Sequence, residues 1–269
     1  MSEKQADIGI IGGTGFYRFF EEVGCSDMKE LKISTPYGDP SDVIKVGTIA
    51  GHKVAFLPRH GLDHRFLPHT VNYRANVWAM KSLGCERVIS PCAVGSLQAH
   101  IKPGSFVIAD QFVDWTDGRK ATFFEGPVCV HPSAADPFCP EMRKIAIDAA
   151  KANGIEVHEK GTVVTINGPR FSTKAESQFF TRQGWDIINM TQYPEVYLVK
   201  ECDMCPLSIA LVTDHDCGLV GDVPPVTHQA VTAVFKNNIE NLKKMLLTIL
   251  ENTPATREHC DCMNTTKTS

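Results

Sequence analysis

The sequence predicts a single-domain α/β sandwich, in which helices cover both faces of a mostly parallel central sheet. Short apolar runs suited to buried strands alternate along the chain with longer amphipathic segments suited to helices, which is typical of this architecture. The chain has 269 residues, of which 43% are hydrophobic. This is enough for one substantial core, and α/β domains of this length are commonly undivided.

Each expected element has its own local signal. Strands are expected where apolar residues run almost without interruption, at Ile8–Ile11, Val54–Leu57, Arg87–Ser90, Ser105–Ala109, Gly161–Ile166, Ile187–Met190 and Ser208–Val212. Helices are expected where apolar residues recur every three or four positions, at Tyr73–Leu83, Pro140–Asn153, Lys174–Gln183, Pro194–Cys202 and Val226–Glu251. Gly84 and Gly154 suit the positions just after helix ends. The polar segment 253–269 is expected to be an unstructured tail after a domain of residues 1–252.

Charge and hydropathy exclude several classes of function. The net charge is −4 and no long run of Lys or Arg occurs, so we expect no nucleic-acid partner. No apolar run approaches the roughly 20 residues that a membrane span needs, and the polar start Met1–Asp7 does not resemble a signal peptide. We therefore expect a cytoplasmic protein with no membrane partner.

The ten cysteines do not suggest a small secreted disulfide framework in a chain of this size. Cys202-x-x-Cys205 and Cys260-x-Cys262 could together form a zinc site, but the second pair lies in the polar tail and is more closely spaced than usual zinc ligands. A disulfide between Cys260 and Cys262 is the preferred interpretation. We predict no metal site.

The segment Ile8–Phe16 predicts a buried strand that runs into an anion-binding turn. Gly12, Gly13 and Gly15 let the backbone approach a ligand and turn its N–H groups inward, while Thr14 adds a hydroxyl donor. A dinucleotide site or a plain tight turn would use the same glycines. A second residue suited to binding an anion is therefore needed to decide between these interpretations.

Cationic and polar residues follow the other expected strands. Arg59 and His60 come directly after Val54–Leu57, and an arginine fork suits a pair of phosphate oxygens. Since ligands collect beyond the carboxyl ends of parallel strands, we also expect site residues in the later strand-end loops, namely Cys92, Ala93, Phe171, Ser172, Met190, Thr191, Asp214 and Asp216. A surface charge at Arg59 and a solvated turn at the aspartates are the alternatives.

These loops resemble those of the purine nucleoside phosphorylase family, in its trimeric branch, and most closely its 5′-methylthioadenosine phosphorylases. The resemblance runs from about residue 7 to about residue 250. It rests on long motifs, namely Ile10-Ile11-Gly12-Gly13-Thr14-Gly15, Thr35-Pro36-Tyr37-Gly38, Pro58-Arg59-His60-Gly61, Asn72-Tyr73-Arg74-Ala75-Asn76, Ala93-Val94-Gly95-Ser96-Leu97, Ala135-Asp136-Pro137-Phe138-Cys139, Gly168-Pro169-Arg170-Phe171-Ser172-Thr173, Met190-Thr191 and Thr213-Asp214-x-Asp216.

The resemblance implies a role for each matching residue and a fold with a mixed, mostly parallel sheet. Phosphate contacts are implied for Thr14, Arg59, His60, Cys92, Ala93 and Thr191. Contacts to the nucleoside are implied for Met190 at the ribose, Phe171 and Ser172 at the base, and Asp214, His215 and Asp216 at the purine edge. His131 matches a residue that a neighbouring subunit contributes near the 5′ substituent, so a homotrimer or a dimer of trimers is implied.

The implied reaction is phosphorolysis of a purine nucleoside, with inorganic phosphate as co-substrate and no cofactor. The leaving purine needs a proton at N7, which a carboxylic acid of raised pKa can supply. We assign that role to Asp214, whose second oxygen would accept a hydrogen bond from a 6-amino group. The expected substrate is S-methyl-5′-thioadenosine, with adenosine and other nucleosides that carry a free 5′-hydroxyl as the alternative.

Departures from the family pattern concern the phosphate end and the 5′ end. Cys92 stands where Ser or Thr is usual, and His215 where Tyr is common. Val231 and His131 match the methylthio pattern, whereas His228 is the residue type of relatives that bind a 5′-hydroxyl. The sequence does not fix the 5′ preference.

Two functions of other classes compete with this assignment. A nucleotide-dependent oxidoreductase would use the glycines at 12–15, but no acidic residue follows at the expected distance after a second strand. A thiol–disulfide exchange protein would use Cys260 and Cys262, yet that pair does not explain the anion loops.

Overall fold

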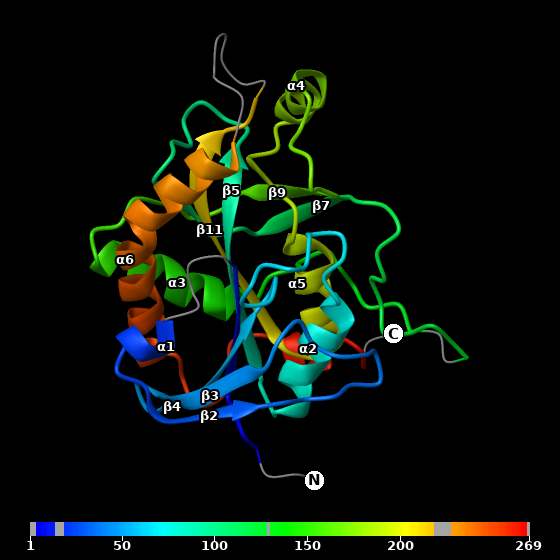
Figure 1. The fold of residues 1–269 in the computed structure, drawn as a ribbon, viewed down its shortest axis with the longest axis vertical. Coiled ribbons are helices and arrows are strands. Elements are labelled where there is room, and N and C mark those ends of the chain that lie inside the picture. Colours follow the sequence, from blue (N-terminus) through cyan, green and yellow to red (C-terminus); the bar gives the residue numbers. More distant parts are fainter. Residues whose placement is uncertain (1–3, 14–18, 128–129, 218–226, 268–269) are drawn as a thin grey trace.

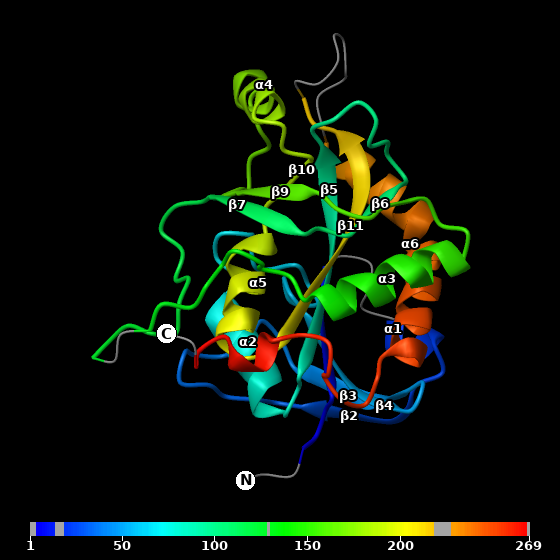
Figure 2. The same cartoon turned by 180° about the vertical axis from the view of Figure 1, so that it is seen from behind.

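The computed structural model describes residues 4–13, 19–127, 130–217 and 227–267. In this part of the chain, eleven strands form one mixed sheet whose main path runs β2-β3-β4-β1-β5-β10-β9-β7 (Figures 1 and 2). The strands are β1 (Ile8–Gly12), β2 (Ser26–Leu31), β3 (Ile44–Ile49), β4 (His52–Pro58), β5 (Arg87–Ser96), β6 (Phe106–Val107), β7 (Gln111–Trp115), β8 (Val157–His158), β9 (Thr162–Ile166), β10 (Ile187–Asn189) and β11 (Cys205–His215).

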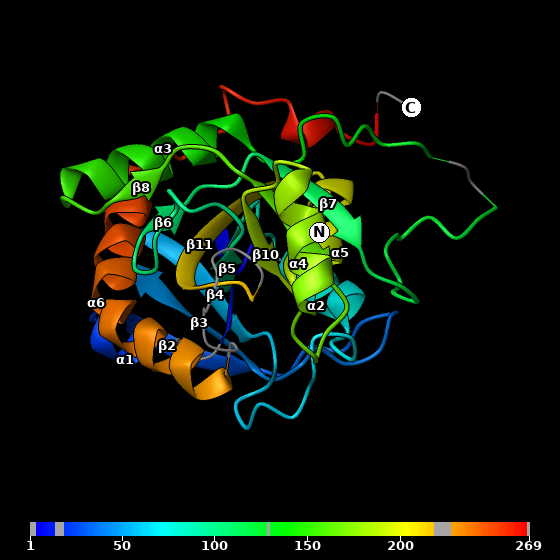
Figure 3. The same cartoon turned by 90° about the horizontal axis from the view of Figure 1, so that it is seen from above.

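Helices cover both faces of this sheet, as Figure 3 shows from above. One apolar core joins the sheet to α3 (Pro140–Ala152) and α6 (His228–Asn252). The opposite face is covered by α2 (Tyr73–Ser82) and α5 (Gln192–Glu201). The remaining helical segments are α1 (Phe19–Glu22), α4 (Lys174–Arg182) and a 3₁₀ turn at Cys262–Asn264. The predicted sandwich with a mostly parallel sheet is confirmed.

Most sheet contacts are parallel because long connections return each chain segment to the same end of the sheet. Parallel pairs are β1 with β4 and β5, β5 with β11, β9 with β7 and β10, and β6 with β8. The antiparallel pairs are β2 with β3, β3 with β4, β6 with β11, and β10 with β5. The last of these shapes the site, as shown below.

The helix-end prediction is also confirmed. Gly84 and Gly154 follow α2 and α3 with φ values of 90° and 66°, in the left-handed region that only glycine enters at little cost. The structure adds strands β2, β3, β7 and β8, which the apolar pattern does not reveal. In β2, with the sequence Ser-Asp-Met-Lys-Glu-Leu, the side chains are almost all exposed, so the strand lies at the sheet edge without an apolar signal.

The C-terminal segment differs from its expectation. Instead of being unstructured, residues 253–267 contact the first residues of β5 and β11 and pack on the core. Arg87 donates to the Thr256 carbonyl at 2.7 Å, and Arg257 donates to the Asp203 carbonyl at 2.7 Å. Cys262 is 6% exposed and belongs to the same core as α3 and α6. Polar composition failed as a guide here because the anchors are hydrogen bonds and thiols rather than an apolar stripe.

Candidate active site

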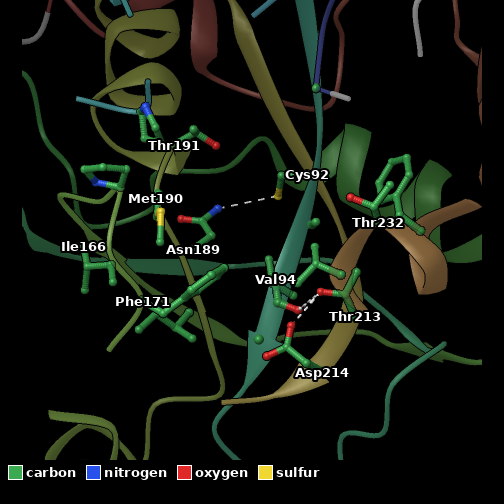
Figure 4. Close-up of a pocket in the computed structure, with 18 of the residues that line it drawn as sticks. Cys92, Val94, Ile166, Phe171, Asn189, Met190, Thr191, Thr213, Asp214 and Thr232 are labelled. Carbon is green, nitrogen blue, oxygen red and sulfur yellow. Dashed lines mark hydrogen bonds between the residues drawn. The ribbon is translucent and has the colours of Figure 1, made fainter. Parts of the chain in front are cut away.

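A cavity of about 470 Å³ opens where the carboxyl ends of several strands meet. Figure 4 shows its residues, with Thr191 and Cys92 toward one end and Asp214 toward the other. Of the residues predicted from sequence, it is lined by Arg59, His60, Cys92, Ala93, Phe171, Ser172, Met190, Thr191, Asp214, Asp216 and Val231. Six segments that are distant in sequence therefore converge on one cavity.

The cavity forms at a break in the pairing along one edge of β5. On this edge β1 pairs with β5 only as far as Ile89, and β10 pairs with it from Gly95 onward. Within the described residues, no strand pairs with this edge of β5 between those two points. Because β10 runs antiparallel to β5, the carboxyl ends of β1 and β10 face each other across the break.

The break leaves backbone groups of β5 available to a ligand. The carbonyl of Pro91 accepts a hydrogen bond from Arg59 on this edge at 3.3 Å. Backbone groups alternate between the two edges of a strand, so the N–H of Ala93 faces the same side as Pro91. A donor from Ala93 therefore survives whatever side chain occupies position 92.

Arg59 lies at this end of the cavity but is bound differently from the sequence prediction. It is 2% exposed, and its Nε and Nη2 donate to the two carboxylate oxygens of Glu195 at 2.7 and 2.8 Å. Nη2 also donates to the carbonyl of Ile11 at 2.7 Å. The fork predicted for phosphate is thus occupied by Glu195, and one N–H of Nη1, beside Gly13, remains for a ligand.

The electrostatics of this pair follow from its burial. Burial alone would lower the pKa of Arg59, but the adjacent carboxylate of Glu195 raises it above the ordinary arginine value. Arg59 is therefore permanently charged, and Glu195 neutralises most of that charge. An anion at this end would be held by oriented N–H and O–H donors more than by net positive charge.

His60 is neutral and its tautomer is fixed by the chain. Its Nδ1 lies 2.8 Å from the carbonyl of Phe66, and because a carbonyl only accepts, Nδ1 carries the proton. Burial first, and then the charge of Arg59, lower the pKa of His60 to about 4. Nε2 is then an acceptor, so His60 would accept a hydrogen bond from a phosphate hydroxyl rather than donate one to phosphate.

Thr191 and Cys92 differ in what their side chains offer. Thr191 immediately precedes α5, and its hydroxyl makes no capping hydrogen bond, so this hydroxyl stays available to a ligand. The thiol of Cys92 is held between Asn189 and Gln192, each at 3.6 Å. Cys92 therefore contributes backbone and packing, while its thiol is already bound.

A sulfur and an aromatic ring line the middle of the cavity. Gly168 has a φ of 65°, and a Cβ there would lie 2.6 Å from the Sδ of Met190, so glycine lets the loop pass over this side chain. Phe171 follows and is 38% exposed toward the cavity. The hydroxyl of Ser172 is buried without a hydrogen-bond partner among the described residues, which suits a donor or acceptor kept for a ligand.

A β-bulge directs Asp214 into the cavity. The pairing of β11 with β5 shifts register between Val212 and Asp214, and such an extra residue re-aims the side chain that follows. Oδ2 accepts a 2.8 Å hydrogen bond from Thr213. Oδ1 lies 3.0 Å from the place where a Cβ on Gly95 would be, so glycine at position 95 makes room for this carboxyl group.

The pKa of Asp214 is raised to about 6, chiefly because burial disfavours the charged form and also because Asp216 lies nearby. Asp216 is 3% exposed, and its Oδ2 has no hydrogen-bond partner in the described parts of the chain. Asp214 can therefore hold a proton up to a pH of about 6. This is the property expected of a general acid.

The structure leaves four of the predicted residues outside the cavity or undescribed. His215 lies between the two aspartates without lining the cavity, and its Nδ1 is buried without a partner among the described residues. His131 is exposed and away from the cavity of its own chain. Thr14 lies outside the described residues, and of His228 only its place as the first residue of α6 is described.

Sequence reasoning missed residues that support the site from behind or line it without polar groups. Glu195 has no motif of its own, and the non-helical backbone at Tyr193 removes any simple helical spacing between it and Thr191. Asn189, which fixes Cys92, immediately precedes the predicted Met190 and could have been included. The other missed lining residues include Leu67, Pro68, Ile166, Ile188, Thr232, Phe235 and Lys236.

Known proteins share this fold and sequence over nearly the whole chain. The S-methyl-5′-thioadenosine phosphorylase of Thermofilum pendens is 51% identical over 259 residues, which cover 96% of both chains. A methylthioadenosine phosphorylase from an Antarctic soil metagenomic library superposes with a TM-score of 0.92 at 37% identity, covering 99% of this chain and 93% of that one. A double mutant of the adenosine/methylthioadenosine phosphorylase of Schistosoma mansoni, in complex with adenine, has a TM-score of 0.84 at 38% identity, covering 91% of each chain.

A protein-family model matches the part of the chain that contains every residue lining the cavity. It is described as the phosphorylase superfamily and matches residues 7–251, a range that includes each strand end and the part of α6 that lines the site. The chain belongs to the phosphorylase superfamily.

Proposed function

We propose that this protein cleaves the N-glycosidic bond of 6-aminopurine nucleosides with inorganic phosphate. Its chief substrate would be S-methyl-5′-thioadenosine, which yields adenine and 5-methylthioribose 1-phosphate. One observation carries the proposal. A buried carboxyl group with a pKa near 6 lies at one end of a cavity whose other end presents backbone and hydroxyl donors. The names of the relatives support the same substrate.

The geometry suits displacement at an anomeric carbon. Phosphate would lie at the end formed by Gly13, Arg59, His60, Ala93 and Thr191. The purine would lie against Phe171 with N7 toward Asp214, and the ribose between them near Met190, which lies between the two ends in Figure 4. Phosphate and purine then occupy opposite faces of the sugar, as in-line attack requires.

Asp214 would both protonate the leaving purine and select for a 6-aminopurine base. As the glycosidic bond breaks, negative charge builds on the purine, and protonated Asp214 neutralises it by giving its proton to N7. The remaining carboxylate oxygen accepts from a 6-amino group, which favours adenine over a 6-oxopurine. The mutant relative in complex with adenine is consistent with this choice.

The assembly, cofactors and location are also part of the proposal. His131 does not line the cavity of its own chain, and its implied role is in the site of a neighbouring subunit, so we expect a homotrimer or a dimer of trimers. Inorganic phosphate is the co-substrate, and no cofactor is proposed. No helix among the described residues has the length and apolarity to cross a membrane. A cytoplasmic location remains a prediction.

The function is tested by a phosphorolysis assay with three nucleosides under the same conditions. Purified protein is incubated with methylthioadenosine, adenosine or inosine, with and without inorganic phosphate, and free base is quantified. We expect phosphate-dependent release of adenine, fastest from methylthioadenosine, and little release of hypoxanthine from inosine. Release of base at the same rate without phosphate would show a hydrolase instead.

Adenosine is the second candidate substrate, favoured by the histidine at position 228. This residue begins α6 one turn before Val231, which lines the cavity. A site built to bond a hydroxyl loses about 1–3 kcal/mol when the hydroxyl is missing. We therefore expect His228→Val to lower kcat/KM for adenosine by about tenfold, which corresponds to about 1.4 kcal/mol, and to preserve or improve methylthioadenosine turnover.

The ratio of kcat/KM values for the two nucleosides is the measurement for His228. Lys244→Met serves as the control, since it removes an exposed polar side chain of α6 that does not line the cavity. That variant is expected to leave the ratio unchanged. If His228→Val lowered kcat/KM equally for both substrates, His228 would stabilise the helix rather than contact the 5′ group of the sugar.

A further inference from the structure

Four cysteines from three separate segments meet at the end of the sheet opposite the cavity. Cys139 is the N-cap of α3, and Cys205 is the first residue of β11. Cys260 and Cys262 come from the C-terminal segment that packs on the core. All four are free thiols, and their sulfur atoms all lie within 4.8 Å of one another. They are the group in the described chain whose potential metal ligands converge in this way.

The spacing of the four sulfur atoms is close to that of a tetrahedral thiolate site. A Zn–S bond of about 2.3 Å places the sulfur atoms of a regular tetrahedron about 3.8 Å apart. The Sγ atoms of Cys205 and Cys260 are 3.5 Å apart, and since all separations lie within 4.8 Å, none exceeds the ideal by more than about 1 Å. Small side-chain rotations are enough to close this difference.

The arrangement suits one shared centre better than two separate disulfides. A disulfide needs two sulfur atoms at about 2.05 Å and pairs each cysteine with a single partner. Here each sulfur has three others around it. The site is also largely closed to solvent, since Cys139 and Cys205 are 0% exposed, Cys262 is 6% exposed and Cys260 is partly buried. Four cysteines that leave no coordination position open are the form of a structural zinc site.

The surroundings can stabilise the negative charge of such a site. Cys139 lies at the N-terminus of the 13-residue helix α3, where the helix dipole favours a thiolate. Arg87 is the register partner of Cys205 in the parallel pairing of β5 with β11, so both side chains lie on the same face of the sheet. The guanidinium of Arg87 is 2% exposed, and its Nε has no partner among the described residues.

We propose that Cys139, Cys205, Cys260 and Cys262 bind one structural zinc ion. On binding, four S–H bonds break and four Zn–S bonds form, and the four protons pass to solvent or buffer. No electrons are transferred. The ion carries two positive charges and the four thiolates carry four negative charges, so the site has a net charge of −2, which the α3 N-terminus and Arg87 offset.

The bound ion would fix the C-terminal segment to the core. Zinc would join the segment after α6 to the starts of α3 and β11. Without the ion, hydrogen bonds such as those of Arg87 to Thr256 and of Arg257 to Asp203 hold this segment. The site lies at the opposite end of β11 from Asp214, about 30 Å along the strand. We therefore expect zinc to change stability and to leave the chemistry of the cavity intact.

The metal content of the full-length protein tests the proposal directly. Protein expressed with zinc and purified under reducing conditions without chelator is expected to contain one zinc per chain by plasma mass spectrometry. Cobalt exchanged into the protein should give the thiolate-to-metal charge-transfer and intense visible bands of a tetrahedral sulfur site. These readouts do not depend on catalysis.

Two variants localise the ion. Cys260→Ser is expected to lower zinc content by roughly tenfold or more, since even changes to residues that support metal ligands typically cost 10–100-fold in affinity. Cys202→Ser is the control, because Cys202 is 6% exposed, as Cys262 is, and lies only three residues from Cys205 but packs in the opposite core. It is expected to retain one zinc per chain. The phosphorolysis rate of both variants at low temperature should equal that of the wild type.

Three results would overturn the proposal. The first is four free thiols with no bound metal after growth in zinc. The second is disulfides among these cysteines, found by mass spectrometry in protein prepared without oxygen. The third is iron in place of zinc at full occupancy.

Discussion

Asp214→Asn is expected to lower kcat/KM for adenine nucleosides by about 10²–10⁴-fold, the range typical of general acid catalysis. Asparagine keeps the shape of the side chain and its contact distance to Thr213, but it has no acidic proton to give to N7. Its amide also donates where the carboxylate accepts, so it suits a 6-carbonyl better than a 6-amino group. The loss should therefore be much smaller for inosine, and the measured adenosine-to-inosine preference should fall or invert.

The pH dependence of the wild type provides an independent check on Asp214. Because the acid must be protonated in the free enzyme, kcat/KM for the nucleoside is expected to fall as pH rises through about 6, the raised pKa of Asp214. In Asp214→Asn this decline should disappear. The exposed Asp117→Asn serves as the control and should keep both the rate and the decline. If Asp214→Asn left both the base preference and the pH profile unchanged, Asp214 would not contact the purine.

Loss of the fold does not explain the expected effect of Asp214→Asn. The pKa of this carboxyl group is raised on folding, mainly by burial, so the folded state holds the proton more tightly than the unfolded chain. Its ionisation therefore destabilises the folded state as pH rises from the unfolded pKa to about 6 and above. Asparagine avoids this cost. The variant should unfold no more easily than the wild type at neutral pH.

The fold could be predicted from sequence wherever burial leaves an apolar pattern. β1, β4 and β9 are buried on both faces, and their near-continuous apolar runs are sufficient to find them. β5 was predicted to end at Ser90, but it continues to Ser96. Its second half contains proline, cysteine and glycine, which are not strand formers. Those residues lie along the edge of β5 that neither β1 nor β10 covers, where the cavity forms. The requirements of the site therefore outweigh the low strand propensity of these residues.

The sequence was sufficient to predict which loops form the site, but not which of their side chains bind one another. Strand ends point to Arg59, Thr191 and Asp214 because parallel strands bring their carboxyl ends together. Nothing in the sequence shows that Arg59 would be bound by Glu195, 136 positions away. The cysteine cluster has the same origin, since Cys139, Cys205 and the tail become neighbours only through tertiary packing. Pairwise contacts at long sequence separation leave no periodic signal in a single chain.

Glu195→Ala is expected to lower the free energy of unfolding by about 3–5 kcal/mol, the usual cost of removing one partner from a buried ion pair. The carboxylate of Glu195 is 1% exposed and accepts two charge-assisted hydrogen bonds from Arg59. Without it, a permanent charge remains buried with only backbone carbonyls as acceptors. Chemical denaturation at a fixed protein concentration measures the change, because stability in an oligomer depends on concentration.

A double-mutant cycle separates the pair from its surroundings. Arg59→Met combined with Glu195→Leu removes both charges, and this double variant should be considerably more stable than the sum of the two single losses predicts. Glu125→Ala is the control. Its carboxylate pairs with Arg74 and Lys120 at the surface, where solvent screens the charges, and its removal should hardly change stability.

Kinetics then distinguish a positioning role for Glu195 from a purely structural one. Glu195→Gln keeps the volume and one acceptor, so the guanidinium stays near its place but loses its fixed orientation beside Gly13. We expect KM for phosphate to rise about tenfold, equivalent to about 1.4 kcal/mol, while KM for the nucleoside stays near its wild-type value. Proportional changes in both constants would mean that Glu195 supports the fold alone. A selective rise for phosphate would place the anion at the break in β5, where Arg59, Ala93 and Thr191 meet.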